Sequence, residues 1–342
     1  MQLLSCQNEN KVEKNGENMS NIHNIIIAGA GIMGSSMAQL FSRYQYEVTL
    51  YDISEESIAK SKQLIKLNQN NALTSGEMSK EEVLESRIHI SFSTDIQCFK
   101  NADFVIEAIA ERIDIKQAFF RQICEYVSEN TILTSNTSGL SLTEIAKAIK
   151  NPERFCGMHW LNPPHICPLV EVISSEKTSD ETIDRVYNVA LDIQRIPVKL
   201  KKEVPGFLVN RFQFAILREA MSLIEDGVAE KEDIDKVFKY GLGLRYACLG
   251  PFEIADLGGL DTFYQIASYL FADLSDTKEV HNMLRKLWEE KDYGVKTGKG
   301  FYDYSDGKDK KIIEKRDKSF AAAISPVRRK KTSSTRRACF LD

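Results

Sequence analysis

The sequence predicts an α/β domain built on a doubly wound sheet, followed by an all-α C-terminal domain. Two observations support this. Short apolar runs alternate with helical or polar stretches up to about residue 203, and only helical patterns follow the turn Val204-Pro205-Gly206. Strands that alternate with helices favour right-handed βαβ crossovers. With 342 residues, 43% hydrophobic and 27% charged, the chain is large enough for two domains, and disorder throughout is excluded.

The first expected strand covers residues 25–28, an apolar run typical of a strand that is buried on both faces of a parallel sheet. A helix is expected over residues 35–44, and a second strand over residues 48–51. The further strands are expected at residues 88–90, 104–109, 132–134, 155–159, 169–173 and 198–200.

Between the second and third strands lie about 35 residues of helical sequence rich in Lys and Gln. This is too long for a simple crossover, so we expect a helical hairpin over residues 54–86 that projects from the domain. The C-terminal helices are expected at residues 207–226, 231–240, 252–270 and 277–290. The expected division is a disordered extension (1–20), a sheet domain (21–203), a helical domain (204–305) and a charged, largely disordered tail (306–342).

Charge argues against a nucleic-acid-binding protein. The chain has 45 basic and 49 acidic residues, a net charge of −4, so it lacks a broad positive field. The tail is the exception, because residues 308–342 hold twelve basic residues and four acidic ones. This basic segment resembles a nuclear-localisation or membrane-surface patch, but we expect it to be an appendage without a role in activity.

The seven cysteines are scattered, form no C-x-x-C pair and have no histidine at a metal-ligand spacing. They are therefore expected to be reduced thiols, and no metal site is expected. No apolar run approaches the roughly 18 residues that a membrane span needs. These features favour a cytoplasmic protein without a membrane or nucleic-acid partner.

A glycine motif follows the first expected strand and precedes the first expected helix. Gly29, Gly31 and Gly34, with Ile32 and Met33 between the last two, form a G-x-G-x-x-G string. The first glycine permits a tight turn, the second allows the backbone to approach a pyrophosphate, and the third allows helix and strand to pack. The helix N-terminus then faces the phosphate charge. This position predicts a dinucleotide site on a Rossmann-type sheet.

Asp52 ends the second expected strand, 18 residues after Gly34. A carboxylate there can accept hydrogen bonds from the adenosine ribose hydroxyls and repels a 2′-phosphate. Because Ile53 and Ser54 follow, and not arginine, the sequence favours NAD over NADP as the cofactor. The alternative is that Asp52 only caps the next helix.

His159 ends one expected strand and Glu171 lies in the next, 12 residues later. Four more segments accompany this pair, at residues 105–108, 135–138, 205–211 and 298–302. These motifs and their order along the chain resemble the L-3-hydroxyacyl-CoA dehydrogenase family, and the resemblance covers residues 22 to about 304. The resemblance implies an NAD-dependent oxidoreductase of fatty acid metabolism.

Chemistry suggests roles for the pair. Oxidation of a secondary alcohol needs a base for the hydroxyl proton, and imidazole has a suitable pKa. We therefore expect His159 to be that base, with Glu171 fixing its tautomer. The resemblance implies that Ser138 and Asn210 hold the substrate oxygen. The alternatives are a structural histidine, a Glu171 on an exposed strand face and a Ser138 that caps a helix.

Further binding residues are implied by the resemblance alone. Glu111, Lys116 and Asn136 match cofactor positions, although an ordinary ion pair at a helix start explains Glu111 and Lys116 equally well. The expected substrate is a 3-hydroxyacyl-CoA of the 3-hydroxybutyryl-CoA type, with the hairpin shielding the CoA. Ser61 and Asn162 are then substrate-binding residues. Lys60, Lys62 and Lys66 are candidates to meet CoA phosphates, or simply form a solvated helix face.

The chain also departs from the common family pattern. Residues 160–165 read Trp-Leu-Asn-Pro-Pro-His, and Ser138-Gly139 and Gly243-Leu244-Arg245-Tyr246 are further departures. These variants resemble a branch that includes L-gulonate 3-dehydrogenase, carnitine dehydrogenase and a pyridine-carboxylate dehydrogenase. In that case Arg245 is a candidate to bind a free carboxylate, unless it forms an internal ion pair. A catalytically inactive NAD-binding protein is the alternative of another class.

The helical C-terminal domain resembles the dimerisation domain of the family. Phe252, Ile254, Ala255 and Leu257 form an apolar stripe on an expected helix. We therefore expect a homodimer, although the same stripe could be core within one chain.

Overall fold

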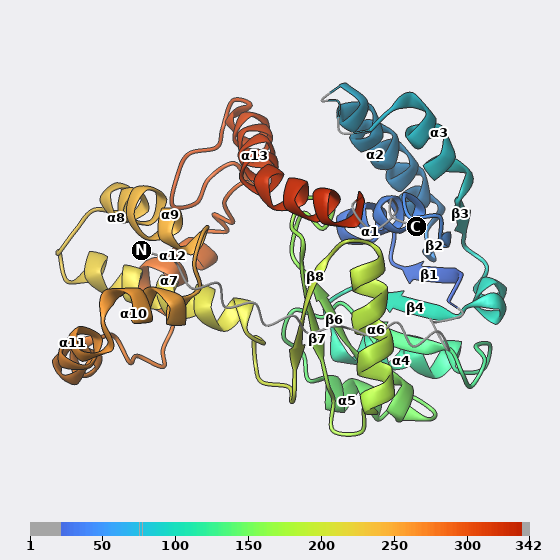
Figure 1. Ribbon diagram of the computed structural model, residues 1–342, viewed down its shortest axis with the longest axis horizontal. Helices are drawn as coiled ribbons and strands as arrows, with labels where there is room; N and C mark the ends of the chain where they lie inside the picture. The colour runs from blue at the N-terminus through green and yellow to red at the C-terminus, as the bar shows by residue number, and fades with distance from the viewer. Residues whose placement is uncertain (1–21, 75, 77, 337–342) are drawn as a thin grey trace, which may run out of the picture. The chain divides into compact units, whose positions relative to one another are not determined.

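The computed structural model describes residues 22–74, 76 and 78–336, so the expected N-terminal extension lies outside the described residues. The chain divides into two compact units, with the boundary between Glu203 and Val204 (Figure 1). Across the described residues, no helix is both long and apolar enough to cross a membrane.

The first unit contains one eight-stranded sheet with the order β3-β2-β1-β4-β5-β6-β7-β8. Strands β1 to β6 run parallel to one another, in the 3-2-1-4-5-6 order of dinucleotide-binding domains. The strands are β1 (Asn24–Ala28), β2 (Glu47–Tyr51), β3 (Ile90–Ser93), β4 (Phe104–Glu107), β5 (Ile132–Ser135), β6 (Phe155–Trp160), β7 (Leu169–Ile173) and β8 (Ile196–Leu200). The predicted doubly wound fold is confirmed.

The last two strands depart from a continuous series of crossovers. β7 runs antiparallel to β6, and β8 runs parallel to β7. Antiparallel strands need no crossover helix, so the short segment 161–168 is enough to join β6 to β7. This reversal brings Glu171 directly opposite His159.

Helices connect and flank the strands of the first unit. They are α1 (Ile32–Ser42), α2 (Glu55–Thr74), α3 (Lys80–Ile88), α4 (Ile113–Ile123), α5 (Leu142–Ala146) and α6 (Asp180–Asp192), with 3-10 turns at Ile96–Asn101 and Pro152–Arg154. Helices α2 and α3 form the predicted hairpin (Figure 1).

The strand expected at residues 88–90 was placed too early, because helix α3 continues to Ile88 and β3 starts at Ile90. A capping box explains where α3 begins. Ser79 Oγ accepts a hydrogen bond from Glu82 N at 3.1 Å, and Glu82 Oε2 accepts one from Ser79 N at 2.6 Å.

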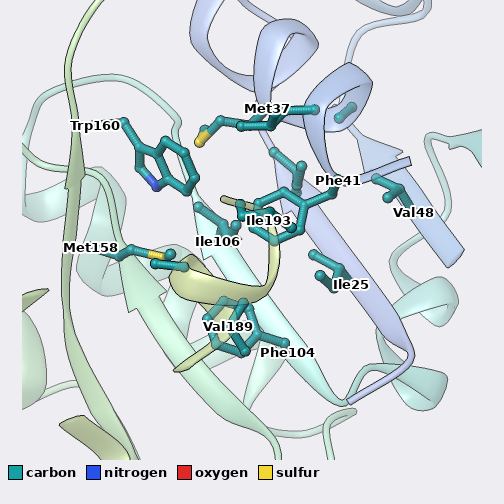
Figure 2. Packing of buried hydrophobic residues seen from close by; sticks show 14 of the residues in the cluster. Ile25, Met37, Phe41, Val48, Phe104, Ile106, Met158, Trp160, Val189 and Ile193 are labelled. Atoms are coloured by element: carbon teal, nitrogen blue, oxygen red, sulfur yellow. The ribbon is translucent and has the colours of Figure 1, made fainter. Parts of the chain in front are cut away.

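One face of the sheet packs against α1 and α6 (Figure 2). Phe104, Ile106, Met158 and Trp160 from the strands belong to this cluster, and Phe41 meets the Trp160 ring edge-on with centroids 5.9 Å apart. Successive strand residues face opposite sides of a sheet. The residues next in sequence to these buried ones, including Glu107 and His159, therefore face the other side. On that second face Phe155 packs against Phe120 of α4, with the ring centroids 5.2 Å apart.

The second unit is helical, as predicted. Its helices are α7 (Val209–Glu225), α8 (Lys231–Val237), α9 (Gly243–Tyr246), α10 (Pro251–Gly258), α11 (Leu260–Asp273), α12 (Asn282–Glu289) and α13 (Lys308–Arg336), with a π-helical turn at Phe238–Leu242.

The helical segment expected over residues 252–270 contains parts of two helices. Gly259, with φ of 90°, separates α10 from α11, and residues with a side chain rarely adopt this conformation. The helix expected over residues 277–290 begins later, at Asn282. Glu225 explains that start, because its carboxylate accepts a hydrogen bond from Met283 N and lies 2.8 Å from His281 Nδ1.

Residues 308–336 of the charged tail form helix α13. Lys, Arg, Glu and Ala are strong helix formers, and they dominate this segment despite its charge. Asp303 also pairs with Lys308 in the first turn of the helix. Residues 337–342 of the tail lie outside the described part of the chain.

Candidate active site

The glycine motif forms the turn from β1 into α1. Gly29 has φ of 108°, and a Cβ added there would lie 2.5 Å from Ala108 O. A Cβ at Gly34 would lie 1.9 Å from Gly29 O, so helix and turn are in direct contact. Both positions therefore require glycine.

Gly31 differs from its two neighbours in the motif. It precedes the first residue of α1 without a side-chain cap, and a Cβ added there meets nothing within 4 Å. The open space lies at the N-terminus of α1, where backbone N–H groups attract a pyrophosphate. Ile32 is 65% exposed at this helix end, whereas Met33 packs against the core. This arrangement fits the phosphates of NAD.

Asp52 joins the end of β2 to the glycine turn. Its Oδ2 accepts a hydrogen bond from Ala30 N at 2.8 Å, and its Oδ1 accepts one from Ser54 N at 2.9 Å. The cap of the following helix is provided by Ser54 instead, whose Oγ accepts from Ser57 N at 3.2 Å. The carboxylate of Asp52 thus lies beside the turn, as a ribose-binding acid of a NAD site does.

His159 and Glu171 are cross-strand neighbours on β6 and β7. His159 Nδ1 lies 2.6 Å from Glu171 Oε2, and the two residues are only 4% and 0% exposed. An ionised Glu171 carboxylate would accept a hydrogen bond from the Nδ1–H tautomer of this ring. The contact fixes the orientation of the imidazole ring.

The glycine turn and the His159–Glu171 pair lie at the same edge of the sheet. Ala28 of β1 is in register with Glu107 of β4, Glu107 with Ser135 of β5, and Ser135 with Gly157 of β6. Neighbouring strands are about 4.8 Å apart, so three steps separate β1 from β6 by about 14 Å. In open α/β sheets, ligands bind beyond the carboxyl ends of the strands, which is where these groups lie.

A polar network occupies the ends of β4 and β5. Glu107 Oε1 lies 2.5 Å from Lys116 Nζ, and Glu107 Oε2 accepts a hydrogen bond from Ser135 Oγ at 2.6 Å. Lys116 Nζ also lies 3.3 Å from Glu111 Oε2. Glu111 Oε1 in turn accepts hydrogen bonds from Thr137 Oγ1 and from Ser138 N, at 2.6 and 2.7 Å.

Burial raises the pKa of Glu107 above its usual range, although Lys116 and Ser135 act in the opposite direction. Glu107, Ser135 and Thr137 are site residues that the sequence did not predict. The available signal was an acid at the end of an apolar strand with a lysine nine residues later.

The other predicted residues of the first unit have different surroundings. Asn136 Oδ1 accepts a hydrogen bond from Trp160 N at 2.8 Å, which joins the ends of β5 and β6. Ser138 and Asn162 are exposed in the segments that follow β5 and β6. Ser61 is only 1% exposed, and it accepts a hydrogen bond from Ser35 Oγ at 2.8 Å. Ser61 thus packs α2 against α1.

Two lysines of the hairpin have partners of their own. Lys60 Nζ lies 2.6 Å from Glu56 Oε1, and Lys62 Nζ lies 4.9 Å from the centre of the Phe92 ring. The second unit carries Asn210, which is half-buried in the first turn of α7, and Arg245, which is exposed on α9.

Both units of the chain are similar to known proteins. Residues 24–204 match the family model of the 3-hydroxyacyl-CoA dehydrogenase NAD binding domain, and residues 206–304 match that of the 3-hydroxyacyl-CoA dehydrogenase C-terminal domain. The 3-hydroxybutyryl-CoA dehydrogenase of Clostridioides difficile is 38% identical, over 82% of this chain and 99% of that protein.

Another relative is named for a different substrate. The 5-formyl-3-hydroxy-2-methylpyridine 4-carboxylate 5-dehydrogenase of Mesorhizobium japonicum is 35% identical, over 88% of this chain and 97% of that protein. A crystal structure of a dehydrogenase of this name, described as NAD+ dependent, matches with a TM-score of 0.82 at 35% identity, over 88% of this chain and 97% of that one.

Proposed function

The chain belongs to the 3-hydroxyacyl-CoA dehydrogenase family and is an NAD-dependent oxidoreductase, and from this premise we propose that it oxidises an L-3-hydroxyacyl-CoA reversibly. The expected substrate is of the 3-hydroxybutyryl-CoA type, in a reaction of fatty acid metabolism. The family predicted from the sequence motifs is confirmed. The observation that carries the proposal is the buried 2.6 Å contact between His159 and Glu171 at the edge of the sheet that holds the glycine turn.

In this proposal His159 is the general base. NAD, when bound, supplies the acceptor for the hydride of the substrate. His159 Nε2 takes the hydroxyl proton, and Glu171 stabilises the imidazolium that results through Nδ1–H. In the reverse direction His159 returns the proton to the ketone oxygen. The Ser138 hydroxyl and the Asn210 amide are proposed to hold that oxygen as its charge changes.

The proposed cofactor site extends along the carboxyl edge of the sheet. The backbone at Gly29, Gly31 and Gly34 would hold the pyrophosphate, and Asp52 would accept hydrogen bonds from the adenosine ribose. The remaining proposed cofactor residues are Ile32, Met33, Glu111, Lys116 and Asn136.

A free hydroxy acid is the second candidate substrate, and two observations favour it. The structure of this chain matches that of a pyridine-carboxylate dehydrogenase with a TM-score of 0.82. In addition, residues 160–165 depart from the common family pattern. The burial of Ser61 also removes one candidate contact to CoA. In this reading Arg245, which is exposed, would bind the carboxylate.

A panel of substrates under one cofactor separates these candidates. NADH absorbance would be followed with 3-hydroxybutyryl-CoA and acetoacetyl-CoA, and separately with gulonate, carnitine and a hydroxylated pyridine carboxylate. Turnover of the thioesters supports the first candidate, and turnover of the free acids alone supports the second. Absence of turnover with every compound would contradict both and favour a catalytically inactive NAD-binding protein.

We also propose that the protein is a homodimer formed through its second unit. Of the side chains described in this unit, only Phe207 and Met221 are buried, whereas Phe252 and Leu257 are 85% and 75% exposed. Helices that leave so much apolar surface open need a partner surface to cover it. Light scattering coupled to size exclusion should give about 78 kDa, twice the chain mass of 38.8 kDa, and a monomer mass would reject the proposal.

The proposed compartment is the cytoplasm. Cys98, Cys124, Cys156 and Cys248 are free thiols, as is usual for proteins kept in a reducing environment. Fractionation of the source cells would test this assignment.

A further inference from the structure

Glu107 is a buried carboxylate that the proposed reaction does not use. It ends strand β4, is 0% exposed, and its two oxygens have three donors. Oε1 accepts from Lys116 Nζ at 2.5 Å and from Ile109 N at 2.8 Å, and Oε2 accepts from Ser135 Oγ at 2.6 Å. So many short contacts hold the carboxylate, and with it Lys116, in one position.

Lys116 connects Glu107 to a second carboxylate nearer the surface. Its ammonium is 1% exposed and lies 3.3 Å from Glu111 Oε2, while the Glu111 side chain is 45% exposed. The other oxygen of Glu111 accepts hydrogen bonds from Thr137 Oγ1 and Ser138 N. A continuous series of contacts therefore leads from the end of β4, through α4, to the segment that follows β5.

The charges in this series depend on one another. A buried ammonium needs a carboxylate partner, because its desolvation is otherwise uncompensated. With Glu107 ionised, Lys116 is held at 2.5 Å from Glu107 and only 3.3 Å from Glu111. Without that charge, Glu111 would be the remaining anionic partner of Lys116. Glu111 would then be drawn toward Lys116 and away from Ser138 N.

We propose that Glu107 is a positioning residue for the nicotinamide end of the cofactor site. Acting through Lys116 and Glu111, it holds the Thr137–Ser138 backbone in the conformation that the bound cofactor and substrate require. The inference rests on the proposed function, since that function puts Glu111, Lys116 and Ser138 beside the reacting groups. Glu107 itself touches neither cofactor nor substrate in this account.

The test compares Glu107→Gln with wild type in the full-length protein. Glutamine keeps the shape but removes the charge, so the dissociation constant for NAD+ should rise by about ten- to a hundredfold. Binding of ADP, which reports on the glycine turn and Asp52, should stay unchanged. Both constants would be measured by isothermal titration calorimetry, together with kcat and KM for NAD+.

Matched variants separate positioning from simple loss of an ion pair. Glu144→Gln removes a contact of 2.6 Å to Lys147 in a side chain that is 47% exposed, and it should change neither constant. Thr137→Val cuts the contact of Thr137 Oγ1 with Glu111 while Glu107 and Lys116 remain paired, and it should weaken NAD+ binding selectively. If Glu107→Gln does not fold, Ser135→Ala is the second variant. It should raise the dissociation constant for NAD+ by a smaller factor and leave that for ADP unchanged.

Two results would overturn the inference. One is unchanged NAD+ binding and turnover in a folded Glu107→Gln protein. The other is equal weakening of NAD+ and ADP binding with a lower melting temperature, which would make Glu107 purely structural. If wild type turns over none of the substrate panel, the proposed function fails separately, and the comparison of NAD+ with ADP still tests the role of Glu107.

Discussion

Replacing Gly34 by alanine should destabilise the first unit. The added Cβ would lie 1.9 Å from Gly29 O, whereas ordinary contacts begin at 3.4 Å, so the turn and α1 must separate by about 1.5 Å. Helix α1 resists this movement because Met37 and Phe41 are 0% exposed in the core. Overpacking of this kind typically costs about 1–3 kcal/mol, occasionally more. At about 2–4 °C per kcal/mol, the melting temperature should fall by about 2–12 °C in a calorimetric scan.

Gly31→Ala is the matched control, because the added Cβ meets nothing within 4 Å and the φ of −75° suits alanine. Its melting temperature should stay within a few degrees of wild type. NAD binding should nevertheless weaken by at least about tenfold, since the Cβ would fill the space proposed for the pyrophosphate. An unchanged melting temperature in Gly34→Ala would refute the contact argument, and unchanged NAD affinity in Gly31→Ala would refute the location of the phosphates.

Three further outcomes are expected. His159→Gln should lower turnover at least about 10²-fold while NADH binding persists in a fluorescence titration. Near-normal turnover would exclude His159 as the base. Asp52→Ala should reduce the preference for NAD over NADP in kcat/KM, and an unchanged ratio would contradict its assigned role. Burial, and then Asp192, raise the pKa of Tyr46 to about 12, so its protonated form stabilises the fold below pH 10. This contribution is lost as the pH rises through 12, and denaturant midpoints should fall more steeply for wild type than for Tyr46→Phe.

Much of the fold and the dinucleotide site could be predicted because the signals are local. The glycine motif, the apolar runs around it and Asp52 lie within about 30 consecutive residues, where chain connectivity alone sets the turn, the strand and the helix. The break at Gly259 was missed, because a glycine inside a helical pattern does not by itself show which φ it adopts. The start of α12 was missed because it depends on Glu225, 58 residues away from Met283.

The amino-acid sequence by itself determined which groups are available: an imidazole, an acid 12 residues later, three glycines and an acid after the second strand. Only the tertiary structure decided which of them meet. His159 contacts Glu171 because β7 reverses direction against β6, and a shift of one residue would turn Glu171 to the opposite face of the sheet. Glu107 acquires its partners in the same way, because pairing of β4 with β5 brings Ser135 beside it and packing of α4 adds Lys116. Such contacts depend on hydrogen-bond register between distant segments, which no local pattern encodes.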